Sequence, residues 1–343
     1  MRRPARSPHL TPTTPELPPV TDAQKAAILS APRTAEAHRR LMAGLPALHR
    51  IQTGGRGGDA PLRAGFTAAA WNLERGLFPE ASAALLAAQG VDAVLLSEMD
   101  NGMARTGQRD TTAAMAQALG MHFAYGVEFF ELGLGGITER ALCREQVNRL
   151  GWHGNAILSR APFRKLALIR LDDDGRWFAP QDGADPGQPR IGGRMALAAV
   201  VEAAFGPLCL VSTHLESSSG AELRAAQFDR LLRAVDAFAP GLPVLIGGDL
   251  NTGNQLPPDW DWRREDLFAM AEERGYGWAL TPAGITTRSS LITPHRTRRM
   301  KLDWFCTKGL AGTGRIVVAE DAHGTPLSDH ECIVAEAIGP AAG

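Results

Sequence analysis

The sequence predicts an α/β fold in which two β-sheets are covered by helices. Short apolar runs of the kind typical of strands recur from residue 66 to residue 337. Helical patterns separate some of these runs, whereas others follow one another directly, as in hairpins. Helices that alternate with some strands and hairpins that join others are typical of packed sheets under an outer layer of helices. No internal repeat of fixed period is present.

The expected elements follow in chain order. The strands cover residues 66–73, 93–97, 155–159, 164–171, 194–202, 208–214, 244–248, 302–307, 315–319 and 332–337. The helices cover residues 79–89, 110–119, 222–238 and 264–273. Gly90 and Gly120 stand where the C-terminal caps of two helices belong, and Ser219 with Glu222 is a capping box before a third.

The N-terminal part of the chain differs in composition from the rest. Residues 1–20 are rich in proline and arginine, and we expect them to be disordered because they cannot bury a core. Residues 21–58 are expected to form a short helical extension that ends in a flexible glycine-rich linker, with Thr21 and Gln24 as a capping box. Residues 59–343 are expected to form the main domain, separable from the extension.

Composition bounds the class of protein. The 343 residues are 44% hydrophobic and 21% charged, as in ordinary globular domains, and the net charge of −1 means that a polyanion must be recognised by a local patch. The four cysteines form no C-x-x-C pair, so we expect buried thiols rather than a disulfide framework or a zinc site. No apolar stretch is long enough to span a membrane, and residues 1–20 lack the hydrophobic core of a signal peptide. We therefore expect a cytoplasmic protein.

Polar side chains stand at the ends of several expected strands, where a purely structural strand has no need of them. Each group alone is typical of a cap or a turn. Asp249 and Asn251, two residues apart, would leave the same face of extended backbone. Together the groups supply what hydrolysis of a phosphate ester needs: ligands for a hard cation, a base for water and donors to phosphoryl oxygens. They are Asn72, Glu98, His214, Asp249 with Asn251, Asp303, and Asp329 with His330.

In this order, and with the run Gly-Asn-Ala-Ile-Leu-Ser-Arg at 154–160, these groups resemble the motifs of the endonuclease/exonuclease/phosphatase superfamily, which includes deoxyribonuclease I. The resemblance covers residues 65–338. It implies a four-layer α/β sandwich, in which two mixed β-sheets pack face to face and are flanked by helices. It also implies an active site at one end, where the loops of both sheets meet.

The resemblance assigns three residues to a metal site. Glu98 matches the principal metal-ligating carboxylate, with Asn72 as its partner and Asp329 as a second acid near the metal. Mg²⁺ is the expected ion because it binds through one or two carboxylates and phosphate, with Mn²⁺ as the alternative.

Five residues match the family's catalytic and substrate-binding set. Asp249 matches the residue that orients or deprotonates the attacking water, and Asn251 the residue that holds the phosphate or that water. His330 matches the histidine that contacts the scissile phosphate, with Asp303 as the carboxylate that orients its imidazole. His214 matches a second histidine, found in the deoxyribonuclease and sphingomyelinase branches, that assists the phosphate or the leaving group.

Two interpretations stay open for several other residues. Arg298 and Arg299 belong to a basic run before the strand at 302–307, which is either a solvated loop or a patch that recognises a substrate phosphate. Arg194 opens a strand and points either at the site or at solvent. Glu128 either supports a histidine or the metal, or ends a solvated strand.

The resemblance implies a metal-dependent hydrolase that cleaves phosphate esters, and a nuclease or another phosphodiesterase fits best. A phosphomonoesterase acting on an inositol phosphate or another soluble phosphorylated metabolite is the alternative. A non-catalytic binding protein on the same fold is disfavoured because every matched position is filled. The two hydrolases share one catalytic set and differ in their substrate loops, expected at 131–152 and 172–193. The expected partner is a phosphate-ester substrate, with nucleic acid as one candidate.

Overall fold

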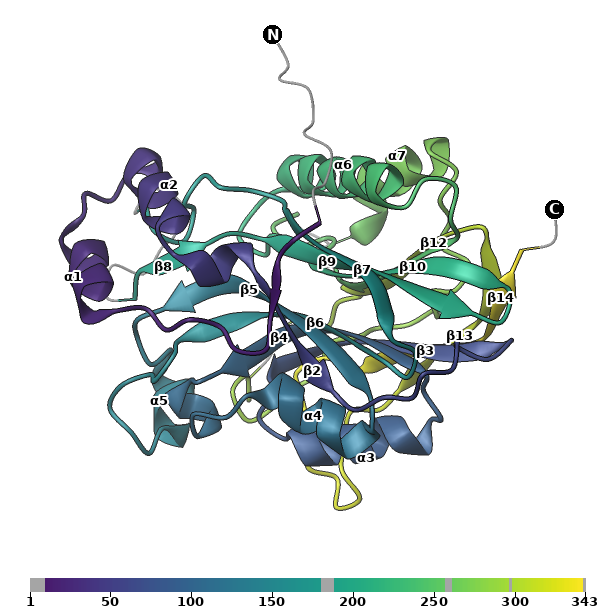
Figure 1. The fold of residues 1–343 in the computed structure, drawn as a ribbon, viewed down its shortest axis with the longest axis horizontal. Helices are drawn as coiled ribbons and strands as arrows, with labels where there is room; N and C mark the ends of the chain where they lie inside the picture. Colours follow the sequence, from purple (N-terminus) through teal and green to yellow (C-terminus); the bar gives the residue numbers. More distant parts are fainter. Residues whose placement is uncertain (1–9, 180–187, 257–260, 296–297, 342–343) are drawn as a thin grey trace, which may run out of the picture.

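A computed structural model describes residues 10–179, 188–256, 261–295 and 298–341. Two β-sheets pack face to face in the middle of the molecule (Figure 1). Helices α6 (Ala221–Phe238) and α7 (Leu267–Glu273) cover the outer face of one sheet, and α3 (Pro79–Ala88) and α4 (Thr111–Leu119) cover the outer face of the other. The predicted four-layer α/β sandwich is therefore confirmed.

The larger sheet has nine strands in the order β1-β2-β5-β6-β4-β3-β14-β13, and β8 also pairs with β5. It is mixed, because β3 and β4 are parallel whereas β3 and β14 are antiparallel. Its strands are β1 (Thr13–Thr14), β2 (Ile51–Gly55), β3 (Phe66–Arg75), β4 (Ala93–Asn101), β5 (His122–Glu131), β6 (Trp152–Ser159), β8 (Arg190–Gly192), β13 (Leu310–Val317) and β14 (Cys332–Pro340).

The smaller sheet has five strands in the order β12-β11-β10-β9-β7. Strands β10 and β11 are parallel, and the remaining neighbours are antiparallel. These strands are β7 (Phe163–Arg170), β9 (Met195–Ala203), β10 (Gly206–His214), β11 (Val244–Asp249) and β12 (Asp303–Lys308).

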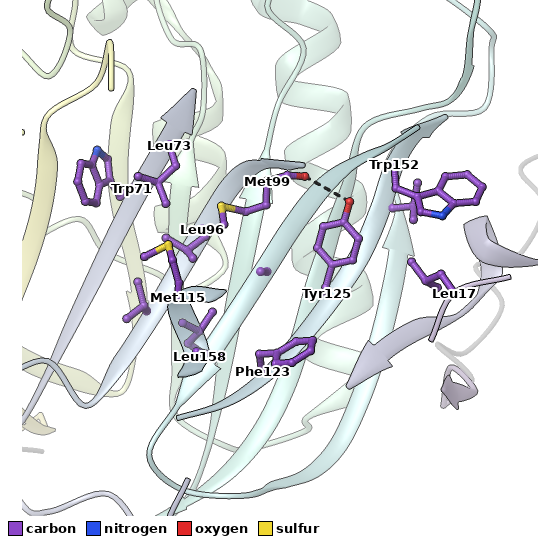
Figure 2. Close-up of a cluster of buried hydrophobic side chains, with 14 of the residues drawn as sticks. Leu17, Trp71, Leu73, Leu96, Met99, Met115, Phe123, Tyr125, Trp152 and Leu158 are labelled. Carbon is purple, nitrogen blue, oxygen red and sulfur yellow. Dashed lines mark hydrogen bonds between the residues drawn. The ribbon is translucent and has the colours of Figure 1, made fainter. Parts of the chain in front are cut away.

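Both faces of each central strand are buried, which explains why these strands read as continuous apolar runs. In β10, Leu208 and Leu210 join the cluster between the two sheets, whereas Cys209 and Val211 join the cluster under α6 and α7. A third cluster fills the space between the larger sheet and its helices (Figure 2). Tyr125 belongs to this cluster, and its hydroxyl donates a hydrogen bond to the Met99 carbonyl at 3.2 Å.

Most of the predicted elements are present, with ends that differ by a few residues. The Thr21–Gln24 capping box is confirmed, but α6 begins after Gly220 without a side-chain cap, so the box predicted at Ser219 is wrong. Strand β5 was not among the predicted strands. Within the two predicted long loops lie α5 (Ile137–Leu142) and β8, while residues 180–187 fall outside the described residues.

The N-terminal residues pack against the main domain, contrary to the prediction of a flexible linker. The glycines of residues 54–55 lie in β2, which pairs with β5 along its whole length. Helices α1 (Asp22–Ser30) and α2 (Ala35–Ala43) and a 3₁₀ turn at 46–49 lie between β1 and β2. Ile28, Leu48 and Ile51 are fully buried. The extension is part of the folded core because its apolar side chains cover surface that the larger sheet would otherwise expose.

The four cysteines are free thiols, and Cys209, Cys306 and Cys332 are buried, as predicted. Within the described residues, no helix combines the length and the hydropathy that crossing a bilayer requires.

We expect that a chain beginning at Gly58 is strongly destabilised. It would lose β2 and three fully buried apolar side chains, each of which contributes about 1.5–3 kcal/mol of burial free energy. The free energy of unfolding, measured by urea denaturation, should therefore fall by about 5 kcal/mol or more. A chain beginning at Leu10 is the control and should unfold at the same urea concentration as the full chain. Equal midpoints for all three chains would show that the extension is separable after all.

Candidate functional site

Strand register brings the predicted residues of the smaller sheet to one edge. His214 ends β10 and lies beside Asp249, which ends β11. Strand β12 runs antiparallel to β11 and begins at Asp303, so Asp303 lies on the other side of Asp249. Three strands thus place an imidazole and two carboxylates in one row, although more than eighty residues separate the first from the last.

The larger sheet supplies the facing residues. Strand β3 carries Asn72 near its end, and β14, which pairs with β3, begins two residues after His330. Gly247 stands at a close approach of the two sheets, because a Cβ atom there would lie 2.8 Å from the Cβ of Ala70. The absence of a side chain at this position lets the ends of β3 and β11 meet.

A cleft of about 520 Å³ opens at this junction. Seven of the predicted residues line it: Glu98, His214, Asp249, Asn251, Arg298, Asp329 and His330. Asn72 and Asp303 are buried immediately behind the lining, where they contact residues that face the cleft. Arg299 does not line the cleft and instead borders a separate groove with Trp262 and Lys301. Residues 296–297 of the basic run lie outside the described residues.

His330 is held between carboxylates. Its Nδ1 lies 2.8 Å from Asp303 Oδ2, and its Nε2 lies 3.6 Å from Asp249 Oδ2. Burial alone would lower the pKa of His330, but Asp303, Asp249 and Asp329 outweigh that effect and raise it to about 10. The imidazole is therefore a cation at neutral pH. Its Nδ1 is fixed by Asp303, so the Nε2–H remains for a partner in the cleft.

The Asn72 amide joins the two sheets. Its Nδ2 donates to Glu98 Oε1 on β4 and to Asp249 Oδ2 on β11, in both cases at 3.1 Å. Its Oδ1 accepts from the Glu74 backbone N–H at 3.1 Å. The backbone at Glu74, Arg75 and Glu98 has positive φ angles of 44°, 80° and 59°, a conformation that costs energy for residues other than glycine. At these positions the pairing of β3 with β4 and the pairing of β4 with β6 shift register.

Glu98 and Asp329 fit a hard divalent cation, because both carboxylates face the same cleft and such ions prefer oxygen ligands. Two features limit the match. Asn72 presents its NH₂ group rather than its oxygen to Glu98, and Arg75 forms an ion pair with Glu98. No cluster of three or more His, Cys, Asp or Glu side chains suited to a metal occurs in the described parts of the chain. A bound ion would therefore depend on water and substrate phosphate for its remaining ligands.

A second wall of the cleft is built from buried charges. Arg194 Nη1 donates to Glu128 Oε1 at 2.8 Å, and Arg194 Nε donates to Glu216 Oε2 at 3.2 Å. Burial would raise the pKa of Glu128, but Arg194 and His214 outweigh it and lower that pKa to about 2. His214 Nδ1 lies 3.6 Å from Glu128 Oε2, and its Nε2 lies 3.7 Å from Asp249 Oδ2. Arg194 therefore points at the site, and its Nη1 lies 2.9 Å from His214 Nδ1, closer to the histidine than the Glu128 carboxylate is.

Sequence reasoning missed several residues of the cleft. Arg75 and Arg190 line it, as do the aromatic rings of Phe129 and Trp177. The Arg190 guanidinium lies 5.1 Å from the Trp177 ring centroid, and Trp177 Nε1 donates to Glu216 at 3.0 Å. Of these residues, Arg75 stands only three residues after the predicted Asn72.

The expectation for Asn251 needs correction. Its backbone is not extended, because φ is +49°. Its side-chain Nδ2 donates to the Leu215 carbonyl at 3.0 Å, and its backbone N–H donates to Asp249 Oδ1 at 2.8 Å. Asn251 still lines the cleft, but it reaches that position through a left-handed turn that also orients the Asp249 carboxylate.

Solved structures share this architecture at low sequence identity. An endonuclease/exonuclease/phosphatase from Beutenbergia cavernae DSM 12333 superposes with a TM-score of 0.57 at 17% identity, covering 81% of this chain and 72% of that one. The catalytic domain of human Nocturnin, with a bound sulfate anion, has a TM-score of 0.54 at 16% identity and covers 85% and 97%. A mannosyl-6-phosphatase from Bacteroides thetaiotaomicron VPI-5482 has a TM-score of 0.52 at 13% identity and covers 80% and 99%. These likenesses establish the fold.

No curated protein matches this chain. The model of the endonuclease/exonuclease/phosphatase family, however, matches residues 69–330, which include every predicted site residue from Asn72 to His330. Members of this family include nucleases, phosphodiesterases and phosphatases, and they typically use divalent metal ions. With the two-sheet fold and the convergence of both sheets on one cleft, that match shows that the chain belongs to the endonuclease/exonuclease/phosphatase family.

Proposed function

We propose that this protein is a Mg²⁺-dependent phosphodiesterase, with nucleic acid as the first substrate class to test. The observation that carries the proposal is the position of Asp249. Its carboxylate lies between two imidazoles, 3.6 Å from His330 Nε2 and 3.7 Å from His214 Nε2, at the floor of an open cleft. A phosphate bound there would lie beside the Asp249 carboxylate, which can accept a proton from water, and beside the two imidazoles of His330 and His214, which can donate hydrogen bonds.

Asp249 is the group that would hold the attacking water. One of its oxygens accepts from the Asn251 backbone, and the other accepts from Asn72, so the carboxylate cannot rotate freely. A fixed acceptor orients water for in-line attack and can take its proton. His330, as a buried cation, would donate from Nε2 to a phosphoryl oxygen and stabilise the charge that develops there.

His214 would act on the other side of the phosphate. Its Nδ1 lies 2.9 Å from Arg194 Nη1 and 3.6 Å from Glu128 Oε2, and its Nε2 lies 3.7 Å from Asp249 Oδ2. This places a second imidazole opposite His330, where the departing oxygen of a diester would need a proton. Two imidazoles beside one carboxylate offer one donor to a phosphoryl oxygen and a second donor to the departing oxygen.

Glu98 and Asp329 are the residues that would hold the divalent ion, with Asn72 positioning Glu98. The ion, when bound, supplies neutralisation of phosphoryl charge. Arg75 contributes a fixed positive charge beside Glu98, and its Nε is held by Glu139 at 2.8 Å.

A phosphomonoesterase is the second candidate. The guanidinium groups of Arg75, Arg190 and Arg298 all line the cleft, and this density of positive charge suits the dianion of a phosphate monoester. The deciding assay incubates the purified protein with Mg²⁺ or Mn²⁺ on plasmid DNA, single-stranded DNA, RNA, bis-p-nitrophenyl phosphate and inositol phosphates. Release of p-nitrophenol or cleavage of a polynucleotide supports the diesterase. Release of inorganic phosphate alone, from inositol phosphates, supports the monoesterase.

Replacing Glu98 by Gln should lower kcat/KM by about 100-fold at limiting Mg²⁺, because the neutral amide loses charge attraction for the ion. Excess Mg²⁺ should restore part of the activity. The control is Glu222→Gln on the exposed face of α6, which removes the same charge at a residue that does not line the cleft and should change nothing. Hydrolysis that persists in EDTA would contradict the metal requirement.

Asp249 and His330 should act as one unit. Asp249→Asn and His330→Ala are each expected to lower kcat by about 10²–10⁴-fold, the usual range for a lost acid–base group. The double variant should be little worse than the poorer single variant, because either loss already disables the shared phosphate site. His323→Ala, at an exposed histidine, is the control. Multiplicative losses in the double variant would mean that the two residues act independently.

A further inference from the structure

The N-terminal residues stand outside the family match and yet are built into the fold. The match begins at residue 69, whereas residues 10–55 form β1, α1, α2 and β2. Figure 1 shows α1 and α2 packed at the end of the molecule where β8 lies. Strand β8 and the segment before it carry cleft residues, so this extension is in a position to influence the site.

His38 is the centre of this contact. It lies on α2, is fully buried, and its Nε2 accepts a hydrogen bond from the Gly192 backbone N–H at 3.1 Å. The His38 ring also packs 6.0 Å from the ring of Phe178. Gly175 lies against it so closely that a Cβ there would come within 2.8 Å of the His38 Cβ. One imidazole therefore contacts two separate segments, at 175–178 and at 192.

Both of these segments continue directly into the cleft wall. Trp177 lies in the turn that is closed by hydrogen bonds from Phe178 and Ala179 to the Gly175 carbonyl, both at 2.8 Å. Arg190 and Arg194 lie two residues before and two residues after Gly192, and both line the cleft. His38 is thus positioned behind the wall that faces the substrate.

A half-buried arginine, Arg170, joins the extension to the main domain at a second point. Arg170 Nη2 donates to the Leu48 carbonyl and to the Val127 carbonyl, each at 2.6 Å. Its Nη1 donates to the Gly193 carbonyl at 3.1 Å. One guanidinium therefore joins the N-terminal extension to β5 and to the link between β8 and β9.

We propose that the N-terminal extension positions the substrate-binding wall of the cleft, and that His38 is the positioning residue that fixes Trp177, Arg190 and Arg194. This inference rests on the proposed function. It holds that Trp177, Arg190 and Arg194 bind the part of a phosphate-ester substrate that lies beyond the scissile phosphate. Loss of the His38 bond leaves a buried Gly192 N–H without an acceptor, which loosens the wall rather than the catalytic floor around Asp249.

Two amide variants separate the hydrogen bond from simple packing. Glutamine places an amide oxygen near the position of Nε2, whereas the shorter asparagine reaches only the position of Nδ1. His38→Gln should therefore keep the bond to Gly192, and His38→Asn should lose it. Arg39→Ala, at the adjacent exposed position of α2, is the control for a change in the helix itself.

In the full chain, His38→Asn should raise KM for the best substrate of the panel by about tenfold, as expected for one buried donor left unsatisfied. Its kcat should stay within about threefold of wild type, since the groups around Asp249 are untouched. His38→Gln and Arg39→Ala should both keep the wild-type KM. A wild-type KM for the asparagine variant, or a loss confined to its melting temperature, overturns the inference.

Hydrogen exchange tests the same inference without any substrate. Peptides that cover 175–179 and 188–194 should exchange faster in His38→Asn than in wild type, and His38→Gln should restore their protection. Unchanged exchange in His38→Asn overturns the inference. A wild-type protein that hydrolyses nothing in the panel refutes the proposed function instead, and the exchange comparison still decides whether His38 holds the wall.

The pH dependence of the wild-type KM tests the same inference without a variant that has lost the hydrogen bond. Nε2 accepts the bond only while it is unprotonated, and burial lowers the pKa of His38 although Asp173 and Asp174 oppose that shift. Arg33, whose guanidinium lies 4.5 Å from the Phe178 ring centroid, is the nearby cation. As the pH falls through the lowered pKa, wild-type KM should rise relative to that of His38→Gln. A ratio of the two KM values that stays constant as the pH is lowered to the limit at which the wild-type protein remains folded overturns the inference.

Discussion

The arrangement of the site depends on one side chain that joins the two sheets. The Asn72 amide donates to Glu98 on the larger sheet and to Asp249 on the smaller one. An amide that is 1% exposed and shared between two carboxylates fixes their separation, because moving either sheet would leave a buried donor or acceptor unpaired. Gly247 allows this approach, since any side chain at that position would hold the sheets apart.

The second constraint is the pairing of buried charge. Arg194 neutralises Glu128 and Glu216, and Arg105 is fully buried against Asp100, Glu131 and Glu139. Burying an unpaired charge at this depth would cost a large desolvation free energy. Each of these charged side chains is therefore held in place by its ion-pair partner. Glu139 binds both Arg105 and Arg75, and Arg75 in turn binds Glu98. The geometry of the cleft is thereby connected to α5 and to the core of the larger sheet.

Much of the fold and most of the site could be predicted from the sequence. The apolar runs predict the central strands because those strands are buried on both faces, and the polar residues beside them include Glu98, His214, Asp249 and His330, which line the candidate cleft. The helices of the N-terminal extension were predicted correctly, but the flexible linker was not, because a run of glycines is typical of linkers and only the pairing with β5 shows that Gly54 and Gly55 belong to a strand. From the sequence, Glu128 could be placed at the end of a strand but its role stayed open, because the arginine that pairs with it is distant in sequence.

The sequence by itself determined which chemical groups the protein has and the order in which they follow the strands. Only the tertiary structure decided which of these groups meet. Asp249 and His330 are brought together by strand register across two sheets, Arg75 reaches Glu98 through a strained strand end, and His38 reaches Gly192 across 154 residues of sequence. Contacts of this kind leave no local pattern in the sequence. The residues around each partner determine only the local helix or strand, and the contact stabilises the protein only when the distant elements pack together.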